Sequence, residues 1–510
     1  MSTVLLTQKY EEQLYGVLHC FDRLLFSGNL HPFCYAQGMT KFLYEQKIRI
    51  FDYPQFVEPL RDAIRTNAEQ LAAANHIKIE FIRKQDGFRK EDRIQTMMQE
   101  RGLQPGLVHI FSAMEQCQSY RSWHDKGQQK TYLQLSQGKC LHYYFYFLDP
   151  ELGLCYLRVP TWCPFRLQFY CNGHNRLALQ LQQAGIAYEQ LDNAFGRIAD
   201  FTQANQMAAT WDMEALHQRL DELARQYCPV VAQFGLSYHW SIMQAEYATD
   251  IVFKNQATLQ AIYPHLLETL IQVVRPTDIA TFLGHKLHGN YQDEMGNRLN
   301  KRWLGTRLKH QMGPVTLKLY DKFNLMLRIE TTVNDVSFFR QHRQVQHRDG
   351  TVTTQDAPMQ KTIYSLPALA QTLQAVNLRY LKFLSDIDTP ENGVKNLQRL
   401  AETSHEDNRR YKGFNLLAEE DASLFRLLLE GSFTIQGFSN RLLRQRLPGK
   451  NSSQITRLLK RLRVHGLIKA VRQHYRYYLT DLGRQAATLA LTLRERFIIP
   501  SLARPVPLSA

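Results

Sequence analysis

The chain has 510 residues, of which 44% are hydrophobic and 21% are charged, and 62 lysines and arginines against 47 aspartates and glutamates give a net charge of +15. This length suits roughly three or four domains, and this composition excludes a disordered chain. No apolar run reaches the roughly 18 residues of a membrane helix, and the first residues lack the pattern of a secretory signal. We therefore expect a folded, cytoplasmic protein with no membrane partner.

The eight cysteines lie between Cys20 and Cys228 without any Cys-x-x-Cys pair. Such scattered spacing predicts reduced and mostly buried thiols. The denser group from Cys140 to Cys171, together with His142 or His174, leaves zinc binding as an alternative.

Residues 1–135 are predicted to form a mainly helical region. Residues 8–74 show a helical pattern, with an apolar stripe that includes Leu14, Leu18 and Phe21. A short strand is expected at 77–82 and a charged helix at 84–100.

Residues 136–340 are predicted to form a central domain around a mixed or antiparallel sheet. Its strands and helices do not follow a regular βα repeat, so the predicted fold class is α+β, in a chain of several domains. The expected elements are strands at 141–147, 154–159 and 165–170 and helices at 176–183, within 200–227 and at 259–274.

Aromatic residues are dense on these first strands, and arginines flank them. Rings can stack on bases while cations contact phosphate, so this surface is a candidate for binding single-stranded DNA or RNA. The alternative is that the rings form the core. His142 is either a metal ligand or a hydrogen-bonded core histidine. The rings are Tyr143, Tyr144, Tyr146, Trp162, Phe165, Phe169 and Tyr170.

A second hairpin is predicted at 315–320 and 325–333, with an apolar face and a charged face. An odd number of residues in the turn would place the charged residues together, whereas an even number would set them against apolar partners. We therefore expect the odd register. The residues that then share a face are Lys318, Tyr320, Arg328 and Glu330.

The spacing Lys-x-Tyr-Asp-Lys followed by Leu-Arg-Ile-Glu resembles a pattern in replication initiators of filamentous phages and rolling-circle plasmids, which nick one DNA strand through a tyrosine. The resemblance covers about sixteen residues and implies that Tyr320 is a nucleophile. Those enzymes also hold a metal with a pair of histidines on a strand, and here only His142 fits. The structural alternative is a salt-bridged, solvent-facing side of a sheet.

If this hairpin is a site, Glu330 would bind a divalent ion, Mg²⁺ or Mn²⁺, or orient a base, while Arg328 and Lys318 would neutralise phosphate. Tyr320 would be the nucleophile or a stacking ring. Further ligands could be Asp250 or Glu246. A set of Asp250, Asp321 and Glu330 would be of the kind that transposases use.

Residues 341–410 are expected to form a linker and one helix, with a polar excursion at 342–359 and the helix at 366–387. Glycine-rich phosphate loops, a Rossmann signature and a His-Glu-x-x-His pattern do not occur. ATP hydrolysis and dehydrogenase chemistry are therefore not expected.

The basic charge is concentrated in the last region, residues 411–500. Between Gly431 and Thr480 there are eleven basic residues and no acidic ones, so this block supplies 11 of the 15 net charges. The pattern predicts two helices, a third and basic helix capped by Ser452 or Ser453, a β-hairpin and a last helix capped by Thr480.

This order of elements resembles the winged helix-turn-helix family over about residues 418–496. In that family the third helix enters the major groove and the wing contacts the DNA backbone, so the resemblance implies double-stranded DNA as a partner. A protein-interaction module is the alternative. The residues that would contact DNA are Ser453, Gln454, Arg457, Lys460 and Arg461 on the helix and Arg472, His474 and Arg476 on the wing.

Together these regions predict a DNA-processing protein that acts in site-specific nicking, replication initiation or recombination of a mobile element. A non-enzymatic DNA-binding regulator or architectural protein is one alternative. A protein that binds RNA or single strands is another.

Overall fold

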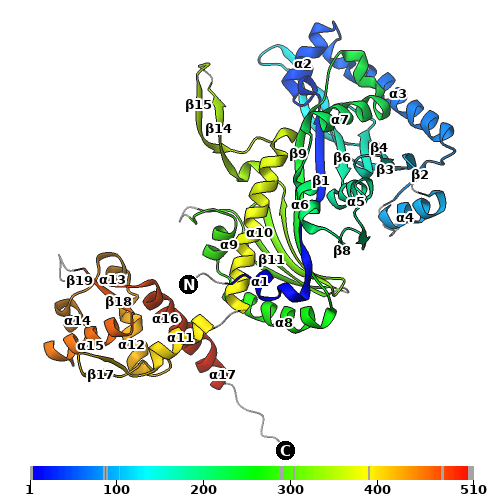
Figure 1. Ribbon diagram of the computed structural model, residues 1–510. Helices are drawn as coiled ribbons and strands as arrows, with labels where there is room; N and C mark the ends of the chain where they lie inside the picture. Colours follow the sequence, from blue (N-terminus) through cyan, green and yellow to red (C-terminus); the bar gives the residue numbers. More distant parts are fainter. Residues whose placement is uncertain are drawn as a thin grey trace, which may run out of the picture. The chain divides into compact units, whose positions relative to one another are not determined.

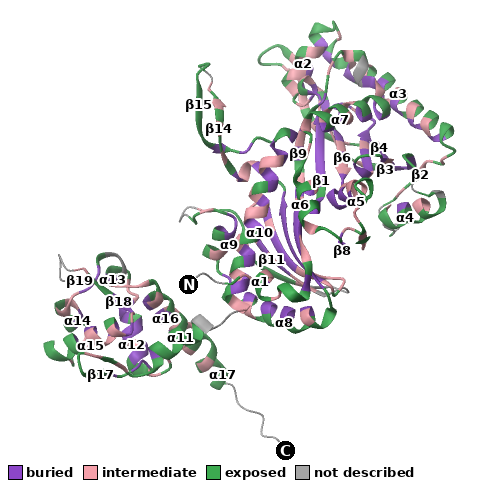
Figure 2. Cartoon of the chain, viewed as in Figure 1, coloured by how far each residue is buried: buried purple, intermediate pink, exposed green. Residues whose placement is uncertain are grey.

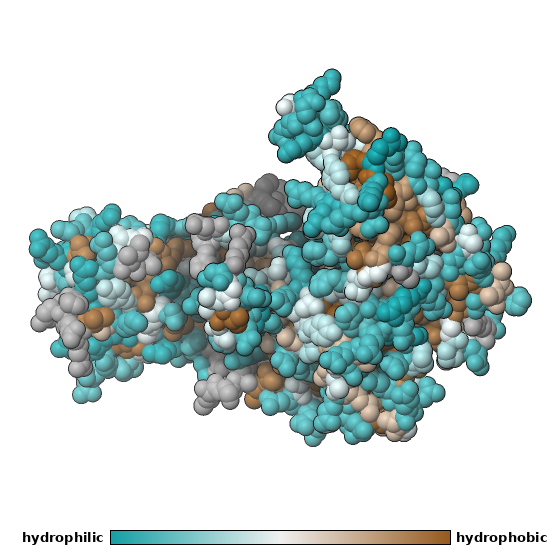
Figure 3. All heavy atoms as spheres, turned by 90° about the horizontal axis from the view of Figure 1, so that it is seen from above, coloured by the Kyte–Doolittle hydropathy of each residue, from teal (hydrophilic) through white to brown (hydrophobic). Residues whose placement is uncertain are grey.

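The computed structural model describes residues 4–83, 87, 90–102, 104–287, 291–302, 305–347, 349–388, 391–471 and 476–503. The chain forms two compact units, Met1–Asp388 and Thr389–Ala510. In the view of Figure 3 hydrophilic side chains predominate and hydrophobic ones are scattered among them, as on folded proteins generally.

An 11-stranded sheet organises unit 1 (Figure 1), with the order β10-β11-β12-β13-β9-β1-β6-β5-β4-β3-β2. All neighbours are antiparallel except β2 and β3, so the sheet is mixed. With its many helices, this sheet confirms the α+β class. The strands are β1 (Leu14–Asn29), β2 (Glu80–Phe81), β3 (Gly106–Asp125), β4 (Lys130–Asp149), β5 (Gly153–Pro160), β6 (Leu167–Cys171), β9 (His239–Phe253), β10 (Met295–Arg302), β11 (Gly305–Met312), β12 (Val315–Lys322) and β13 (Met326–Val333).

Helices cover this sheet, and buried residues lie along its strands and on the inner sides of the helices (Figure 2). Leu317 and Ile329 of the sheet share one apolar core with Leu373 and Val376 of α10. The opposite face of β12 and β13 therefore carries their polar side chains. The helices are α1 (Leu6–Lys9), α2 (Ala36–Glu45), α3 (Tyr53–Ala74), α4 (Lys90–Arg101), α5 (Gly173–Gln183), α6 (Phe201–Ala209), α7 (Met213–Tyr227), α8 (Gln256–Val273), α9 (Pro276–Phe282) and α10 (Leu366–Asp388).

The predicted helical N-terminal region is wrong in its most apolar part. Leu14, Leu18 and Phe21 lie on β1, at the centre of the sheet. A strand buried on both faces is apolar at most positions, and such a run resembles a helical stripe. The predicted boundary at residue 135 falls within β4, so one sheet joins the two regions that we expected to be separate.

The polar stretch at 342–359, which we expected to be an irregular excursion within a linker, forms regular secondary structure. It forms a two-stranded hairpin of β14 (Arg340–Gln346) and β15 (Val352–Pro358), which projects from unit 1 (Figure 1). Elsewhere, a further small hairpin pairs β7 (Tyr188–Gln190) with β8 (Phe195–Ile198).

The odd register of the central hairpin is confirmed. Lys318 pairs with Glu330 and Tyr320 with Arg328, and Lys322 pairs with Met326 across a three-residue turn. The turn residues Phe323 and Asn324 both have positive φ. Lys318, Tyr320, Arg328 and Glu330 therefore share one face.

Unit 2 has helices, a basic helix, a hairpin and a last helix in the predicted order. Asn451 rather than a serine caps the basic helix, and Thr480 caps the last helix as predicted. A short hairpin lies within residues 404–411, where no strand was predicted. The elements are α11 (Glu391–Ala401), β16 (Ser404–Glu406), β17 (Arg409–Tyr411), α12 (Glu419–Leu428), α13 (Gly431–Gln436), α14 (Asn440–Arg446), α15 (Ser452–Val464), β18 (Ile468–Val471), β19 (Arg476–Leu479), α16 (Asp481–Thr492) and α17 (Ile499–Leu502).

Candidate functional site

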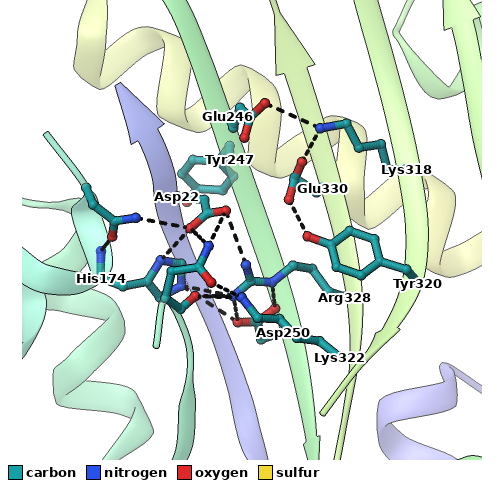
Figure 4. A network of polar contacts seen from close by, with 12 residues as sticks. Asp22, His174, Glu246, Tyr247, Asp250, Lys318, Tyr320, Lys322, Arg328 and Glu330 are labelled. Atoms are coloured by element: carbon teal, nitrogen blue, oxygen red, sulfur yellow. Dashed lines mark hydrogen bonds and ion pairs between the residues drawn. The ribbon is translucent and has the colours of Figure 1, made fainter. Parts of the chain in front are cut away.

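Three carboxylates from three adjacent strands meet on the polar face of the sheet (Figure 4). Asp22 lies on β1, Glu246 on β9 and Glu330 on β13, and one oxygen of each lies within 4.8 Å of the others. Among the described residues, no other group of histidines, cysteines and acids has this geometry. Carboxylate oxygens are the ligands that Mg²⁺ and Mn²⁺ prefer. We call these three residues the acidic triad.

A β-bulge in β1 sets the direction of Asp22. Phe21 pairs with Tyr247 and Arg23 pairs with Glu246, so Asp22 is an extra residue between two consecutive pairs. Bulges of this kind redirect a side chain and are frequent next to active sites.

The N-terminus of α5 lies against this bulge. A Cβ atom on Gly173 would be 2.3 Å from the carbonyl oxygen of Phe21, so only glycine allows this approach. Asn172, the N-cap of α5, donates a hydrogen bond from Nδ2 to Asp22 at 3.3 Å. His174 Nδ1 is also 3.3 Å from Asp22. The positive end of a helix dipole thus faces a carboxylate, which is a favourable arrangement.

Arg328 is completely buried, and its guanidinium group is held by carboxylates. Its Nε and Nη2 donate to the two oxygens of Asp250 at 2.6 Å each, and its Nη1 donates to Asp22 at 3.3 Å. Its Nη2 also donates to the backbone oxygen of Asn193 at 2.8 Å. Because no part of Arg328 is accessible, the structure contradicts the predicted contact of this residue with phosphate.

This network changes the pKa of its members in opposite directions. Burial alone would raise the pKa of Asp22 and Asp250, but Arg328 and His174 outweigh burial and hold both pKa values well below the usual range. Burial alone would lower the pKa of Arg328, but the two aspartates raise it well above its usual value. All three groups are therefore charged at neutral pH.

Lys318 and Tyr320 both contact Glu330. Lys318 Nζ donates to Glu330 through a short hydrogen bond and to Glu246 at 3.3 Å. The Tyr320 hydroxyl donates to Glu330 Oε2 at 2.5 Å. Burial, and then the charge of Glu330, raise the pKa of Tyr320 well above its usual value. Glu330 is thus within hydrogen-bond distance of the phenolic proton of Tyr320.

These side chains line a pocket of about 350 Å³, at the lower end of the range for small-molecule sites. Lys322 also lines it, and burial and then the nearby Arg328 lower the pKa of the ammonium group to about 8. Burial, and then the charge of Glu330, raise the pKa of Glu246. The pocket is lined by Asp22, Glu246, Lys318, Tyr320, Lys322 and Glu330, among others.

Only part of the predicted metal set is brought together. Glu330 belongs to the acidic triad together with Glu246, one of the two further ligands that we considered, whereas the other, Asp250, is occupied by Arg328. Asp22 was not predicted, because its role depends on a bulge that the sequence pattern does not reveal. Asp321 lines the pocket but is not a member of the triad.

His142 lies elsewhere, on β4, and is 1% exposed. Its Nδ1 is 3.1 Å from the carbonyl oxygen of Cys140, and burial, followed by the charge of Arg158, lowers its pKa to about 4. It is therefore the hydrogen-bonded core histidine of the two alternatives. The cysteines from Cys140 to Cys171 are buried and free, and in the described part of the chain they belong to no group with metal-ligand geometry.

The aromatic residues predicted as a stacking surface are mostly core residues. Trp162 and Tyr170 are partly buried. The fully or nearly buried rings are Tyr143, Tyr144, Tyr146, Phe165 and Phe169. The core interpretation of this aromatic stretch is therefore confirmed.

In unit 2, some of the residues predicted to contact DNA are exposed, whereas others form hydrogen bonds within the unit. Ser453 and Arg457 are exposed on α15. Gln454 is also exposed, but its side chain accepts a hydrogen bond from the Asn451 backbone at 2.8 Å and so caps the helix. Arg476 donates to the backbone oxygen of Gln436. Arg472 and His474 lie outside the described residues.

Arg461 is committed to the fold of unit 2. It donates to the backbone oxygens of Lys412 and Gly413, pairs with Asp421 at 3.2 Å and lies 3.8 Å from the ring centre of Phe414. The predicted DNA contact of Arg461 is therefore contradicted.

Lys460 is neutralised within unit 2. It pairs with Glu406 at 3.0 Å and with Asp407 at 3.2 Å. Of the predicted cations on α15, Arg457 is thus the most accessible.

No family model matches the chain, and neither a curated protein nor a solved structure matches it. Within the described residues, no helix is long and apolar enough to cross a membrane. The function must therefore be argued from the geometry of the acidic triad and of α15.

We predict that Asp250→Asn lowers the free energy of unfolding of the protein by about 3–5 kcal/mol, because it leaves Arg328 buried with an incomplete partner. Because the pKa of Asp250 is depressed in the folded state, the stabilisation by this carboxylate is present above about pH 4 and is lost as the pH falls. Urea unfolding at pH 7 and pH 3 measures both effects.

The matched control is Asp356→Asn, since Asp356 pairs with Arg340 in an ion pair whose side chains are 61% and 50% exposed. An exposed pair of this kind contributes at most about 1 kcal/mol. Equal losses in the two variants would show that the buried network does not stabilise unit 1.

Proposed function

We propose that this protein recognises duplex DNA through unit 2 and breaks a DNA strand at the acidic triad of unit 1, with Mg²⁺ or Mn²⁺. The observation that carries the proposal is the meeting of three carboxylates, a lysine and a tyrosine in one open pocket. Ion pairs that only stabilise a fold do not need to line a pocket. The apolar core of unit 1 is also complete without the three carboxylates, the lysine or the tyrosine.

The residues of the pocket support a phosphoryl transfer to tyrosine. A divalent ion held by the acidic triad would supply charge neutralisation at the phosphate. The Tyr320 oxygen bonds to phosphorus while its proton passes to Glu330, and the bond from phosphorus to the leaving sugar oxygen breaks. Lys322, in its protonated form, gives that oxygen a proton. The product is a phosphotyrosine and a free hydroxyl end.

Unit 2 supports the choice of DNA as substrate. A basic helix followed by a two-stranded hairpin suits a winged helix-turn-helix domain, in which the basic helix enters the major groove. Arg457, exposed on α15, is the residue best placed for such a contact.

The second candidate function is that of a non-enzymatic DNA-binding regulator. One observation favours it, because Lys318 pairs with both Glu246 and Glu330. In that case the acidic triad would be a structural ion-pair cluster, and unit 2 alone would carry the function.

We predict that Glu330→Gln lowers the rate of metal-dependent strand breakage by about 10²–10⁴-fold, because the phenolic proton then has no base to accept it. The rate of strand breakage is measured on a denaturing gel. The substrates are end-labelled duplex and single-stranded DNA, incubated with the protein and Mg²⁺, Mn²⁺ or a chelator. Tyr320→Phe should abolish the covalent protein–DNA product while duplex affinity is unchanged.

Glu268→Gln, on the exposed side of α8, is the control for loss of a carboxylate. Absence of metal-dependent breakage in the unaltered protein, with duplex binding retained, would reject the enzyme and leave the regulator. Breakage that persists in Glu330→Gln would place the chemistry elsewhere.

A second prediction concerns pH. Because the pKa of Lys322 is lowered to about 8, its protonated form is present below that pH and is lost above it. The rate of strand breakage should therefore decline as the pH rises through about 8. In Lys322→Arg the decline should move to higher pH, since a guanidinium group stays protonated. An identical profile in both proteins would exclude Lys322 as the proton donor.

We also predict that Arg457→Ala weakens duplex binding and reduces the salt slope of log K by about 0.9, the value for one phosphate contact. Arg461→Ala should instead lower the thermal stability of unit 2, because its partners lie within the fold. Arg484→Ala, an exposed arginine on α16, is the control. Equal affinity of Arg457→Ala and the control would remove α15 from the DNA interface.

A further inference from the structure

The hairpin of β14 and β15 is exposed on both of its faces. Of its strand residues only Ala357 is buried, and Figure 2 shows the hairpin exposed along most of its length. A two-stranded hairpin without a packed face is only marginally stable in water, so it gains stability when a partner covers one of its faces. We call this hairpin the ribbon.

One face of the ribbon carries amide and hydroxyl groups. Gln344 pairs with Thr354 and Gln346 pairs with Val352, and directly opposite residues point to the same face. All four are exposed, and in the described part of the chain the side chains of Gln344, Gln346 and Thr354 form no hydrogen bond. Glutamine can bind the edge of adenine with two hydrogen bonds, and a threonine hydroxyl can donate to or accept from a base edge.

The ribbon lacks the residues that dominate protein interfaces. Its sequence from Arg340 to Pro358 contains no tryptophan, tyrosine, phenylalanine or methionine. Side chains of these types are enriched in the buried centres of protein interfaces, where a few anchors carry most of the binding energy. The composition therefore favours a partner that is bound through hydrogen bonds, such as nucleic acid.

The charges of the ribbon are compatible with such a partner. Its sequence has three arginines and two aspartates, and both aspartates are occupied within the ribbon. Asp356 pairs with Arg340 at 2.6 Å, and Asp349 accepts two hydrogen bonds from Thr351. Arg343 donates to two backbone oxygens and, among the described residues, has no acidic partner. The ribbon therefore has a net positive charge.

A pocket of about 530 Å³ lies at the base of the ribbon, where Arg340 and Asp356 line it together with Arg379 and His285. Arg379, on α10, donates from Nε to the backbone oxygen of Phe282 at 2.8 Å, and no acidic side chain of the described residues pairs with it. Burial lowers the pKa of Arg379, and burial followed by the charges of Arg379 and Arg340 lowers the pKa of His285. An anion at this position would therefore be stabilised. A backbone phosphate is the anion that duplex DNA presents beside its grooves.

We propose that the ribbon enters the major groove of duplex DNA, where Gln344 and Gln346 contact base edges and Arg379 contacts a backbone phosphate. The major groove of B-form DNA admits a two-stranded ribbon, whereas that of A-form RNA is too narrow. From Arg340 to Gln346 the ribbon spans about 20 Å, and the groove is about 8.5 Å deep. The outer half of the ribbon can therefore reach the bases while its inner end stays beside the backbone. This site goes beyond the proposed function, because it lies on unit 1 and needs neither α15 nor strand breakage.

The test is the double variant Gln344→Ala/Gln346→Ala in the full-length protein. The unaltered protein is first used to select its preferred sequence from a pool of random duplexes. Each lost amide contact reduces affinity at least about fivefold, so affinity of the variant for that sequence should fall about 25-fold, and its own selected sequence should have about two fewer specified base pairs. The melting temperature should be unchanged, because both side chains are exposed.

The phosphate contact is tested by Arg379→Gln. This variant should bind all duplexes more weakly and to a similar extent, and the salt slope of log K should decrease by about 0.9, the value for one phosphate contact. Arg379→Lys, which keeps the charge, should retain the slope of the unaltered protein. An unchanged slope in Arg379→Gln would overturn the phosphate contact.

The control is Gln128→Ala/Gln137→Ala, which removes two exposed amides from β4 and from the turn before it. Equal affinities and equal selected sequences in the ribbon variant and this control would overturn the proposal, as would absence of duplex binding by the unaltered protein. If the ribbon variant changes the oligomeric state without DNA, measured by light scattering, and leaves duplex affinity unchanged, the ribbon binds a second copy of the chain and the proposal is likewise overturned.

The ribbon and the proposed function can fail independently. A loss of affinity in Gln344→Ala/Gln346→Ala, with Arg457→Ala equal to its own control, would keep the ribbon and reject α15. A loss in Arg457→Ala, with none in the ribbon variant, would keep α15 and reject the ribbon. Strand breakage on single-stranded DNA is scored in a separate assay and tests the acidic triad alone.

Discussion

The burial of Arg328 between two aspartates is the interaction on which the central site depends. Three charged groups lie almost completely out of water, and their desolvation is offset only because the guanidinium group forms two 2.6 Å hydrogen bonds with Asp250 and one contact with Asp22. The three residues come from β13, β9 and β1. If any strand shifted by one residue, a buried charge would lose its partner.

The same interaction explains why residues that are distant in the sequence can form one site. Asp22 and Arg328 are 306 positions apart, and Arg328 is 154 positions from His174. The bulge in β1 turns Asp22 toward the arginine, and Gly173 lets α5 approach from the other side. With Asp22 fixed in this way, Glu246 and Glu330 on the next two strands complete the acidic triad.

The local sequence pattern was enough to predict the elements that have one charged face and one apolar face. The register of the central hairpin followed from keeping Lys318, Tyr320 and Glu330 off the apolar face, and the structure has that register. In unit 2, the apolar stripe of α15 and the Thr480 cap were similarly evident. These features depend on neighbours within about thirty residues.

The other parts of the fold and of the site could not be predicted, because they depend on contacts between residues that are distant in the sequence. β1 is buried on both faces and therefore has no polar side to reveal its period of two. Asp22 gains its role from a bulge, and Arg461 loses its predicted role because Asp421 and two backbone oxygens capture it. Tertiary packing decides such cases, and the residue type alone predicts the wrong partner.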